Sequence, residues 1–212
     1  DIIILPGSKS TLADLATLKD QGWDIDIRAA HRRGTHVLGI CAGYQMLGRC
    51  VADPNGVEGS AGVSDGLGLL DVETVITGKK ILTEVQGTAI VGGAPVSGYE
   101  MHMGNTTGPD LVRPMFKFHG LPEGARSAEG HTAGTNVHGL FTSDEFRHSF
   151  INFFSAIPMD RLHYAQIVDQ TLDHLATHLE RHLDLERLLT IARGRTAPYY
   201  VSKSKITTIV KS

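Results

Sequence analysis

The stretch Gly39-Ile-Cys-Ala-Gly43 decides the fold class of this chain. It follows the apolar run at residues 35–40 and precedes a short helical pattern with Tyr44, Met46 and Leu47. A cysteine with a glycine two positions before it and another two positions after it, on a turn from strand to helix, has the form of a nucleophile elbow with Cys in place of Ser. Glycines at these positions let the strand and the helix pass closely. The stretch therefore predicts a reactive cysteine at the end of a buried strand.

Cys41 is the predicted nucleophile. Its sulfur would lie at a helix N-terminus, where the helix dipole and free amide groups lower the pKa of a thiol. The alternative is a buried structural cysteine in a Gly-rich turn. The other cysteine, Cys50, has no such setting and is interpreted as a small core residue.

A cysteine nucleophile needs a base, usually a histidine that is distant in sequence. Among eleven histidines, His138 is favoured because Thr135-Asn-Val-His-Gly-Leu-Phe141 looks like a strand that ends in His just before a helix. In a parallel sheet, such a residue shares the carboxyl edge with Cys41. A strand-end histidine held by backbone groups is the alternative, and His102 is interpreted as a pocket or packing residue.

The N-terminal half predicts an α/β fold of flavodoxin-like type, with a doubly wound, mostly parallel sheet and helices on both faces. Residues 1–6 form a short apolar run that is typical of a strand buried on both faces. A helix with Leu15 and Leu18 on its apolar face should begin at Ser10 or Thr11 and stop at Gly22. Two strand-helix units in succession favour this fold.

Residues 53–68 are rich in turn-forming types and predict a surface loop, and further strands are expected at 70–76, 84–91, 98–103 and 135–140. Thr142 and Glu145 have the spacing of a capping box. A longer helix ending at Gly194 should bury a leucine stripe. The stripe consists of Leu172, Leu175, Leu179 and Leu183. We expect one domain over residues 1–194 and assign no role to the tail at 195–212.

The composition excludes several classes of protein. The chain has 212 residues, 41% of them hydrophobic and 20% charged, with a net charge of −3. There is no basic excess for nucleic-acid or anionic-membrane binding. No apolar run approaches the roughly 18 residues of a membrane span, and the first residues do not resemble a signal peptide. With only two cysteines, the chain is expected to be cytoplasmic.

Gly7-Ser-Lys-Ser10 resembles the end of a phosphate-binding loop, but Ile2 stands where that pattern needs its first glycine. No nucleotide site is therefore predicted in this chain. The loop around Gly7 follows the first strand, so its amides could face Cys41 and stabilise an oxyanion. Three histidines recur every four residues, but on a solvated helix face they predict no metal site. They are His174, His178 and His182.

Five motifs together resemble the glutamine amidotransferase domain of cobyric acid synthases. They occur in that family's order, and the similarity runs from residue 1 to about residue 193. The motifs are Leu5-Pro-Gly-Ser-Lys-Ser-Thr-Leu-Ala-Asp-Leu15, Gly39-Ile-Cys-Ala-Gly-Tyr-Gln-Met-Leu-Gly48, Gly66-Leu-Gly-Leu-Leu-Asp-Val72, Gly98-Tyr-Glu-Met-His-Met-Gly104 and Val137-His-Gly-Leu-Phe141.

The resemblance implies a class I type glutaminase domain that converts glutamine to glutamate. Cys41 would attack the side-chain amide, His138 would relay a proton to the departing ammonia, and water would hydrolyse the thioester. Backbone amides of Ala42 and Gly7 would hold the oxyanion. The residues implied in glutamine binding are Ser8, Gln45 and Tyr99.

In the full family enzyme, ammonia passes to an ATP-dependent synthetase domain that amidates adenosylcobyrinic acid a,c-diamide, a corrinoid. That domain normally precedes this one, and its absence fits the missing phosphate loop and the start at Asp1. ATP and Mg²⁺ are expected there, and no cofactor is expected in this domain. Two positions depart from the pattern: Ala42 replaces a usual Gly, and Leu140 stands where many class I amidotransferases carry Glu. A Cys-His dyad is therefore expected, and the third residue stays unnamed.

Other functions share part of this pattern. An amidotransferase domain could serve another acid, such as cobyrinic acid or a cell-wall precursor. A cysteine hydrolase on a similar flavodoxin-like fold would share the elbow without the motifs around Gly7 and His138. A non-catalytic binding domain would keep the elbow as structure only, without a depressed Cys41 pKa.

Overall fold

The computed structural model describes residues 1–155 and 162–194. The chain divides into two compact units, Asp1–Tyr164 and Ala165–Ser212. The division falls inside the range 1–194 that the sequence analysis treated as one domain. The tail at 195–212 lies outside the described residues. All predicted site residues belong to the first unit.

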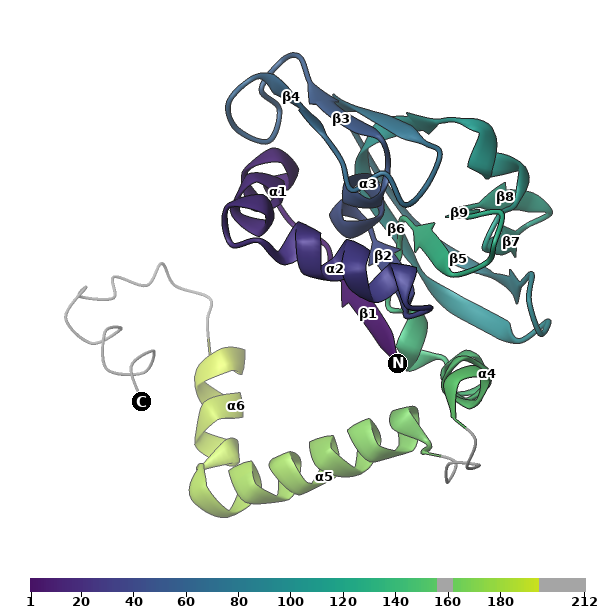
Figure 1. The fold of residues 1–212 in the computed structure, drawn as a ribbon. Coiled ribbons are helices and arrows are strands. Elements are labelled where there is room, and N and C mark those ends of the chain that lie inside the picture. The colour runs from purple at the N-terminus through teal and green to yellow at the C-terminus, as the bar shows by residue number, and fades with distance from the viewer. Residues whose placement is uncertain (156–161, 195–212) are drawn as a thin grey trace. The chain divides into compact units, whose positions relative to one another are not determined.

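The first sheet carries the elbow. Its strand order is β1-β2-β10-β9, and β1, β2 and β10 run parallel, while β9 is antiparallel to β10. The elbow follows β2 in the centre of this sheet (Figure 1). The bounds are β1 (Ile2–Leu5), β2 (His36–Ile40), β9 (Ala125–Arg126) and β10 (Thr132–Thr135).

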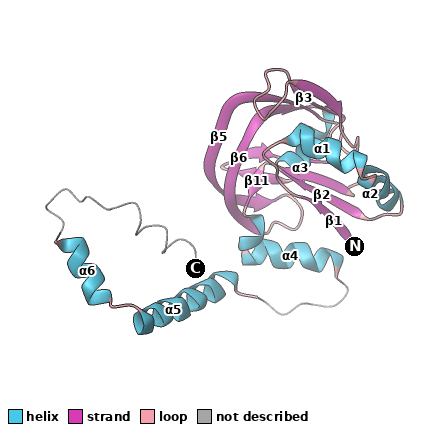
Figure 2. Cartoon of the chain, turned by 90° about the vertical axis from the view of Figure 1, so that its left-hand side faces the viewer, coloured by secondary structure: helices cyan, strands magenta, loops and turns pink. Residues whose placement is uncertain are grey.

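Helices cover both faces of this sheet, because its side chains alternate between two apolar clusters. Val37 of β2 packs in one cluster with Leu18 and Ile27, and Leu38 packs in the other with Phe146. Figure 2 shows α1, α2 and α3 on one side of β1 and β2 and α4 on the other. Their bounds are α1 (Thr11–Asp20), α2 (Trp23–Arg32), α3 (Ala42–Leu47) and α4 (Asp144–Phe154).

The second sheet differs from the predicted one. Its order is β11-β6-β5-β3-β4, with β7 paired to β5 and β8 paired to β7. All its pairs are antiparallel except β3 with β5. The α/β class is therefore confirmed, and the mostly parallel sheet is the first one, while the strands of the second half form a separate, mostly antiparallel sheet. The bounds are β3 (Cys50–Asp53), β4 (Gly62–Asp65), β5 (Glu73–Ala89), β6 (Pro95–Thr107), β7 (Phe116–Phe118), β8 (Leu121–Glu123) and β11 (Val137–His138).

Three local predictions are corrected in the first unit. Residues 70–76 and 84–91 do not form two strands, because the 17-residue strand β5 runs through the turn expected between them and pairs with β6 on both sides of a register shift between Val75 and Lys80. The predicted loop at 53–68 contains β4, which gains order by pairing with β3. The first strand is not buried on both faces, since β1 lies at the sheet edge and Ile4 is 42% exposed.

The C-terminal helices also depart from prediction in detail. The capping box is wrong by one residue: Ser143 is the N-cap of α4, and the Thr142 hydroxyl donates to the Gly139 carbonyl instead. The second unit contributes most of α5 (Tyr164–His182) and all of α6 (Leu185–Arg193). Within the second unit, the predicted leucine stripe is exposed rather than buried, because α5 and α6 do not cover each other's apolar faces. The exposed members are Leu172, Leu175, Leu179 and Leu183.

Close packing of α3 against the first sheet confirms the role of the elbow glycines. A Cβ on Gly43 would lie 2.0 Å from the carbonyl oxygen of Leu5, and a Cβ on Gly39 would lie 2.6 Å from the Cα of Tyr44. The ring of Tyr44 in turn fills the space beside Gly134 on β10. Side chains at these glycines would push α3 away from all three parallel strands.

We expect Gly43→Ala to lower the free energy of unfolding by at least about 2 kcal/mol, because the added methyl group collides with backbone that cannot move without shifting β1. Gly78→Ala is the matched control, since a Cβ there meets nothing within 4 Å. Urea unfolding followed by circular dichroism measures both. Equal stability of the two variants would contradict this account of the elbow.

Candidate active site

Cys41 occupies the sharp turn that the elbow motif predicts. Its φ of 54° and ψ of −114° are strained for a residue with a side chain, and among the described residues only His119 shares a positive φ outside glycine. The amide of Cys41 donates to the carbonyl of Thr135 at the end of β10 (2.7 Å). The turn is therefore anchored to the neighbouring strand, and α3 begins at Ala42.

The pKa of Cys41 is raised from its ordinary value, opposite to the predicted direction. Burial of the thiol is the main cause, and the negative charge of Glu58 adds to it. The amide of Ala42 favours the thiolate, but its effect is smaller. A six-residue helix with a partly buried terminal thiol thus does not provide the net stabilisation that the sequence implied.

His138 reaches the site by another route than the predicted one. It does not end a parallel strand: β10 ends at Thr135, and His138 lies on β11, which pairs antiparallel with β6. Its ring stacks on that of Tyr99, with centroids 5.3 Å apart and planes 8° apart. Its Nε2 donates to the carbonyl of Met101 on β6 (3.1 Å).

The carbonyl of Met101 brings the two predicted catalytic side chains together. It also accepts a hydrogen bond from the Sγ of Cys41 (3.3 Å), so both polar groups converge on one oxygen. Gly7 lies against the same pair: a Cβ there would be 3.2 Å from Cε1 of His138 and 3.5 Å from Cβ of Cys41. The loop after β1, the turn after β2 and strand β11 therefore meet at one point.

The other predicted site residues differ in their burial and in their hydrogen bonds. Gln45 is buried, and its side-chain amide accepts from the hydroxyl of Thr11 (3.2 Å) and donates to the carbonyl of Met103 (3.4 Å). Ala42 is buried, and Tyr99 is 41% exposed. The structure fixes the Gln45 side chain and leaves part of the Tyr99 ring open.

Ser8 lies in the loop after β1. Its hydroxyl donates to Asp14 and accepts from the amide of Ser10 (2.9 Å). These contacts tie the loop that carries Gly7 to the start of α1. They hold the Ser8 hydroxyl within its own segment rather than on Cys41 or His138.

Sequence reasoning missed Glu58 as a neighbour of the thiol. It lies in the segment predicted to be a loop, where its carboxylate accepts from the amide of Thr11 at the start of α1 (2.9 Å). Acidic groups near helix N-termini are stabilised by the free amides there. No spacing in the sequence links Glu58 to Cys41, because the chain between them passes through β3.

Histidines outside the pair have other environments. His102 is partly buried, and its Nε2 lies 2.8 Å from Oε1 of Glu100. His178 and His182 lie at exposed positions of α5, with tilted rings whose centroids are 4.4 Å apart. Over residues 1–155 and 162–194, no group of three His, Cys, Asp or Glu side chains is placed to hold a metal ion. Within the same ranges, no helix combines the length and apolarity needed to cross a membrane.

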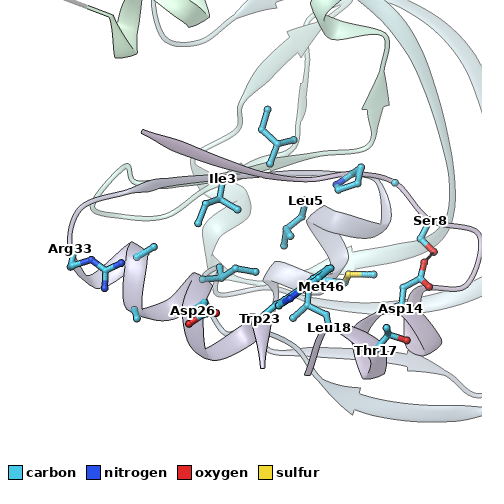
Figure 3. A pocket seen from close by; sticks show the side chains of 16 residues that line it. Ile3, Leu5, Ser8, Asp14, Thr17, Leu18, Trp23, Asp26, Arg33 and Met46 are labelled. Carbon is cyan, nitrogen blue, oxygen red and sulfur yellow. Dashed lines mark hydrogen bonds between the residues drawn. The ribbon is translucent and has the colours of Figure 1, made fainter. Parts of the chain in front are cut away.

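A groove of about 730 Å³ runs along β1 between α1 and α2. Figure 3 shows Ser8 and Asp14 at one end of it and Arg33 at the other, with Leu5, Leu18 and Met46 between them. Gly7 also lines it, but neither member of the predicted catalytic pair does. The groove is therefore distinct from the point where the Cys and His side chains converge.

Solved structures define the class of fold. One titled as a crystal structure of glutamine amidotransferase matches with a TM-score of 0.53 and 16% identity, over 74% of this chain and 79% of that one. PurLQS from Thermotoga maritima matches with a TM-score of 0.51 and 18% identity, over 73% and 80%. The first unit thus has the fold of class I glutamine amidotransferases.

The family follows from sequence comparison. The model of the CobB/CobQ-like glutamine amidotransferase domain matches residues 1–146, so the chain belongs to that family. Cobyric acid synthase from Cereibacter sphaeroides is 55% identical over 193 residues, and that from Bradyrhizobium diazoefficiens is 54% identical over 192 residues. Each match covers 91% of this chain, which spans about 40% of the length of these curated relatives.

We expect Glu58→Gln to lower the pKa of Cys41, because the substitution removes a negative charge that disfavours the thiolate, while the amide oxygen can still accept from Thr11. The pH dependence of iodoacetamide alkylation, resolved by mass spectrometry at Cys41 and Cys50, measures it. Glu145→Gln is the control, since Glu145 is exposed. An unchanged Cys41 profile in Glu58→Gln would contradict the assignment.

Proposed function

We propose that this chain hydrolyses glutamine to glutamate and ammonia, with Cys41 as the nucleophile and His138 as the proton relay. The observation that carries the proposal is the convergence of both side chains on the carbonyl of Met101, at 3.3 and 3.1 Å. Their polar atoms are therefore no farther apart than the sum of these distances. Catalytic contacts of this looseness in an unliganded site are ordinary, because they tighten when substrate binds.

The reaction proceeds in two steps on this pair. The Cys41 sulfur bonds to the side-chain carbonyl carbon of glutamine while the thiol proton passes to His138. The C–N bond then breaks, the nitrogen leaves as ammonia with the proton from His138, and a thioester remains. Water attacks the thioester with His138 as base, which releases glutamate and restores the thiol. The raised Cys41 pKa makes this proton transfer necessary, since the resting thiol is mostly protonated.

Backbone amides at Gly7 and Ala42 would bind the oxyanion. Both residues adjoin Cys41, Gly7 across the sheet edge and Ala42 as the first residue of α3. Amides that are held before reaction stabilise developing charge without reorganisation. Tyr99, with its ring against His138, and the residues Ser8 and Gln45 are the proposed contacts of glutamine.

We propose further that the ammonia serves an ATP-dependent amidation. The curated relatives are named cobyric acid synthase and extend well beyond this chain, which supports a synthetase portion as the partner. ATP and Mg²⁺ would act there, on carboxylates of adenosylcobyrinic acid a,c-diamide. The alternative acids are cobyrinic acid and a cell-wall precursor.

We expect Cys41→Ala to abolish glutamate release from glutamine, because the variant lacks the thiol that forms the thioester beside His138. Cys50→Ala is the matched control and should keep at least about half of the activity, since Cys50 lies on β3, away from the convergent pair. The assay is glutamate release with and without a separately supplied synthetase portion of a relative, ATP, Mg²⁺ and each candidate acid.

The same assay separates the alternatives. Amide formation with only one of the acids identifies the substrate of the full enzyme. Glutamate release that persists in Cys41→Ala would overturn the nucleophile. No release under any condition, with Cys41 also unreactive toward a glutamine-analogue alkylating agent, would leave a non-catalytic binding domain.

A further inference from the structure

The junction between the two sheets sets the distance between Cys41 and His138. β10 ends at Thr135 in the first sheet, β11 begins at Val137 in the second, and only Asn136 lies between them. A shift of this single linking residue would move the base relative to the nucleophile. Its environment therefore bears on how the pair is aligned.

Backbone hydrogen bonds tie this junction to both halves of the site. The carbonyl of Thr135 accepts from the amide of Cys41 (2.7 Å). The carbonyl of Asn136 accepts from the amide of Met101 (3.4 Å), the residue whose own carbonyl receives Cys41 and His138. The carbonyl groups of two consecutive residues, Thr135 and Asn136, therefore bind the amides of Cys41 and Met101.

The side chain of Glu123 forms hydrogen bonds with both Thr135 and Asn136. Glu123, the last residue of β8, accepts from the hydroxyl of Thr135 through Oε2 (2.5 Å) and from the amide of Asn136 through Oε1 (2.8 Å). The same hydroxyl accepts from the amide of Val137 (3.1 Å). A single carboxylate therefore fixes the end of β10, the link and the start of β11.

We propose that Glu123 is a positioning residue for the Cys41–His138 pair, an inference that rests on the proposed glutamine hydrolysis. It contacts neither side chain and acts through the junction of Thr135 and Asn136. No glutamate follows His138 by two positions, since Leu140 stands there and is buried. Glu123 aligns the pair from the backbone rather than by holding the imidazole.

The charge state of Glu123 gives the proposal a readout in pH. Burial raises the pKa of this carboxyl to about 7, the charge of Glu100 on β6 adds to the rise, and the bonds from Thr135 and Asn136 oppose it. Tyr44 on α3 also faces it, and Glu123 raises the pKa of that phenol. The ionised carboxylate accepts both bonds, whereas a protonated carboxyl loses acceptor capacity. The positioning effect is therefore present above about pH 7 and weakens below it.

The test compares Glu123→Gln with the unaltered chain, because the amide keeps the size of the side chain but offers a single acceptor oxygen. We expect kcat for glutamine hydrolysis to fall about tenfold or more at pH 8, with KM changed less than about threefold, since misalignment of reacting groups acts mainly on the chemical step. The ratio of the two kcat values should approach 1 below pH 6.

Thr135 supplies a second pair of variants. Thr135→Val removes the hydroxyl with little change in volume and should reproduce the loss in kcat, while Thr135→Ser keeps the hydroxyl and should restore it. Glu145→Gln is the control for loss of an exposed carboxylate. Thermal unfolding of each variant shows whether the fold is retained. A pH-independent kcat ratio in Glu123→Gln, or equal kcat for the two Thr135 variants, would overturn the proposal.

Alkylation of Cys41 by iodoacetamide tests the positioning without glutamine. If Glu123 aligns the pair, His138→Ala changes the alkylation rate in the unaltered chain at least threefold more than in Glu123→Gln. If Cys41→Ala loses hydrolysis but Glu123→Gln keeps unchanged kinetics, the positioning role is contradicted and the glutaminase function is supported. If the chain shows no glutaminase activity but His138→Ala still affects alkylation more in the unaltered chain than in Glu123→Gln, the glutaminase function is contradicted and the positioning role is supported.

Discussion

The close approach of α3 to the three parallel strands is the constraint on which the rest of the structure depends. Gly43 lies against the Leu5 carbonyl of β1, Gly39 lies under the backbone of Tyr44, and the Tyr44 ring covers Gly134 of β10. Only a chain without side chains at these positions can bring helix and strands this close. The strained backbone of Cys41 follows from it, because the turn must reverse the chain within one residue.

The second sheet completes the site that the first sheet begins. The long β5–β6 hairpin places Tyr99 and the Met101 carbonyl opposite the elbow, and β11 adds His138 to the edge of β6. The proposed catalytic groups therefore come from two sheets joined at residues 135–137. A network of hydrogen bonds that joins Glu123 to Thr135 and Asn136 spans this joint.

Burial has a larger effect on the pKa of Cys41 than the N-terminus of α3 has. The thiol of Cys41 lies partly buried beside Glu58, and both effects favour its protonated form. The amide of Ala42 favours the thiolate, but its effect on the pKa is smaller than that of burial. A protonated resting thiol protects the residue from oxidation and unspecific alkylation, because the thiolate is the reactive species. In the proposed reaction, His138 is the base that activates it.

Local patterns determined much of this protein. The glycines at 39 and 43 determined a tight strand-to-helix turn around Cys41, and the apolar runs before it indicated strands, because these features depend on neighbours in sequence. The same patterns predicted Gly7 and His138 near the thiol, but the parallel strand end predicted for His138 is wrong. Tertiary structure alone decided that His138 comes from an antiparallel strand, that burial raises the Cys41 pKa, and that Glu123 grips Thr135 and Asn136. These features depend on contacts between distant segments, and the spacing of residues along the sequence does not reveal such contacts.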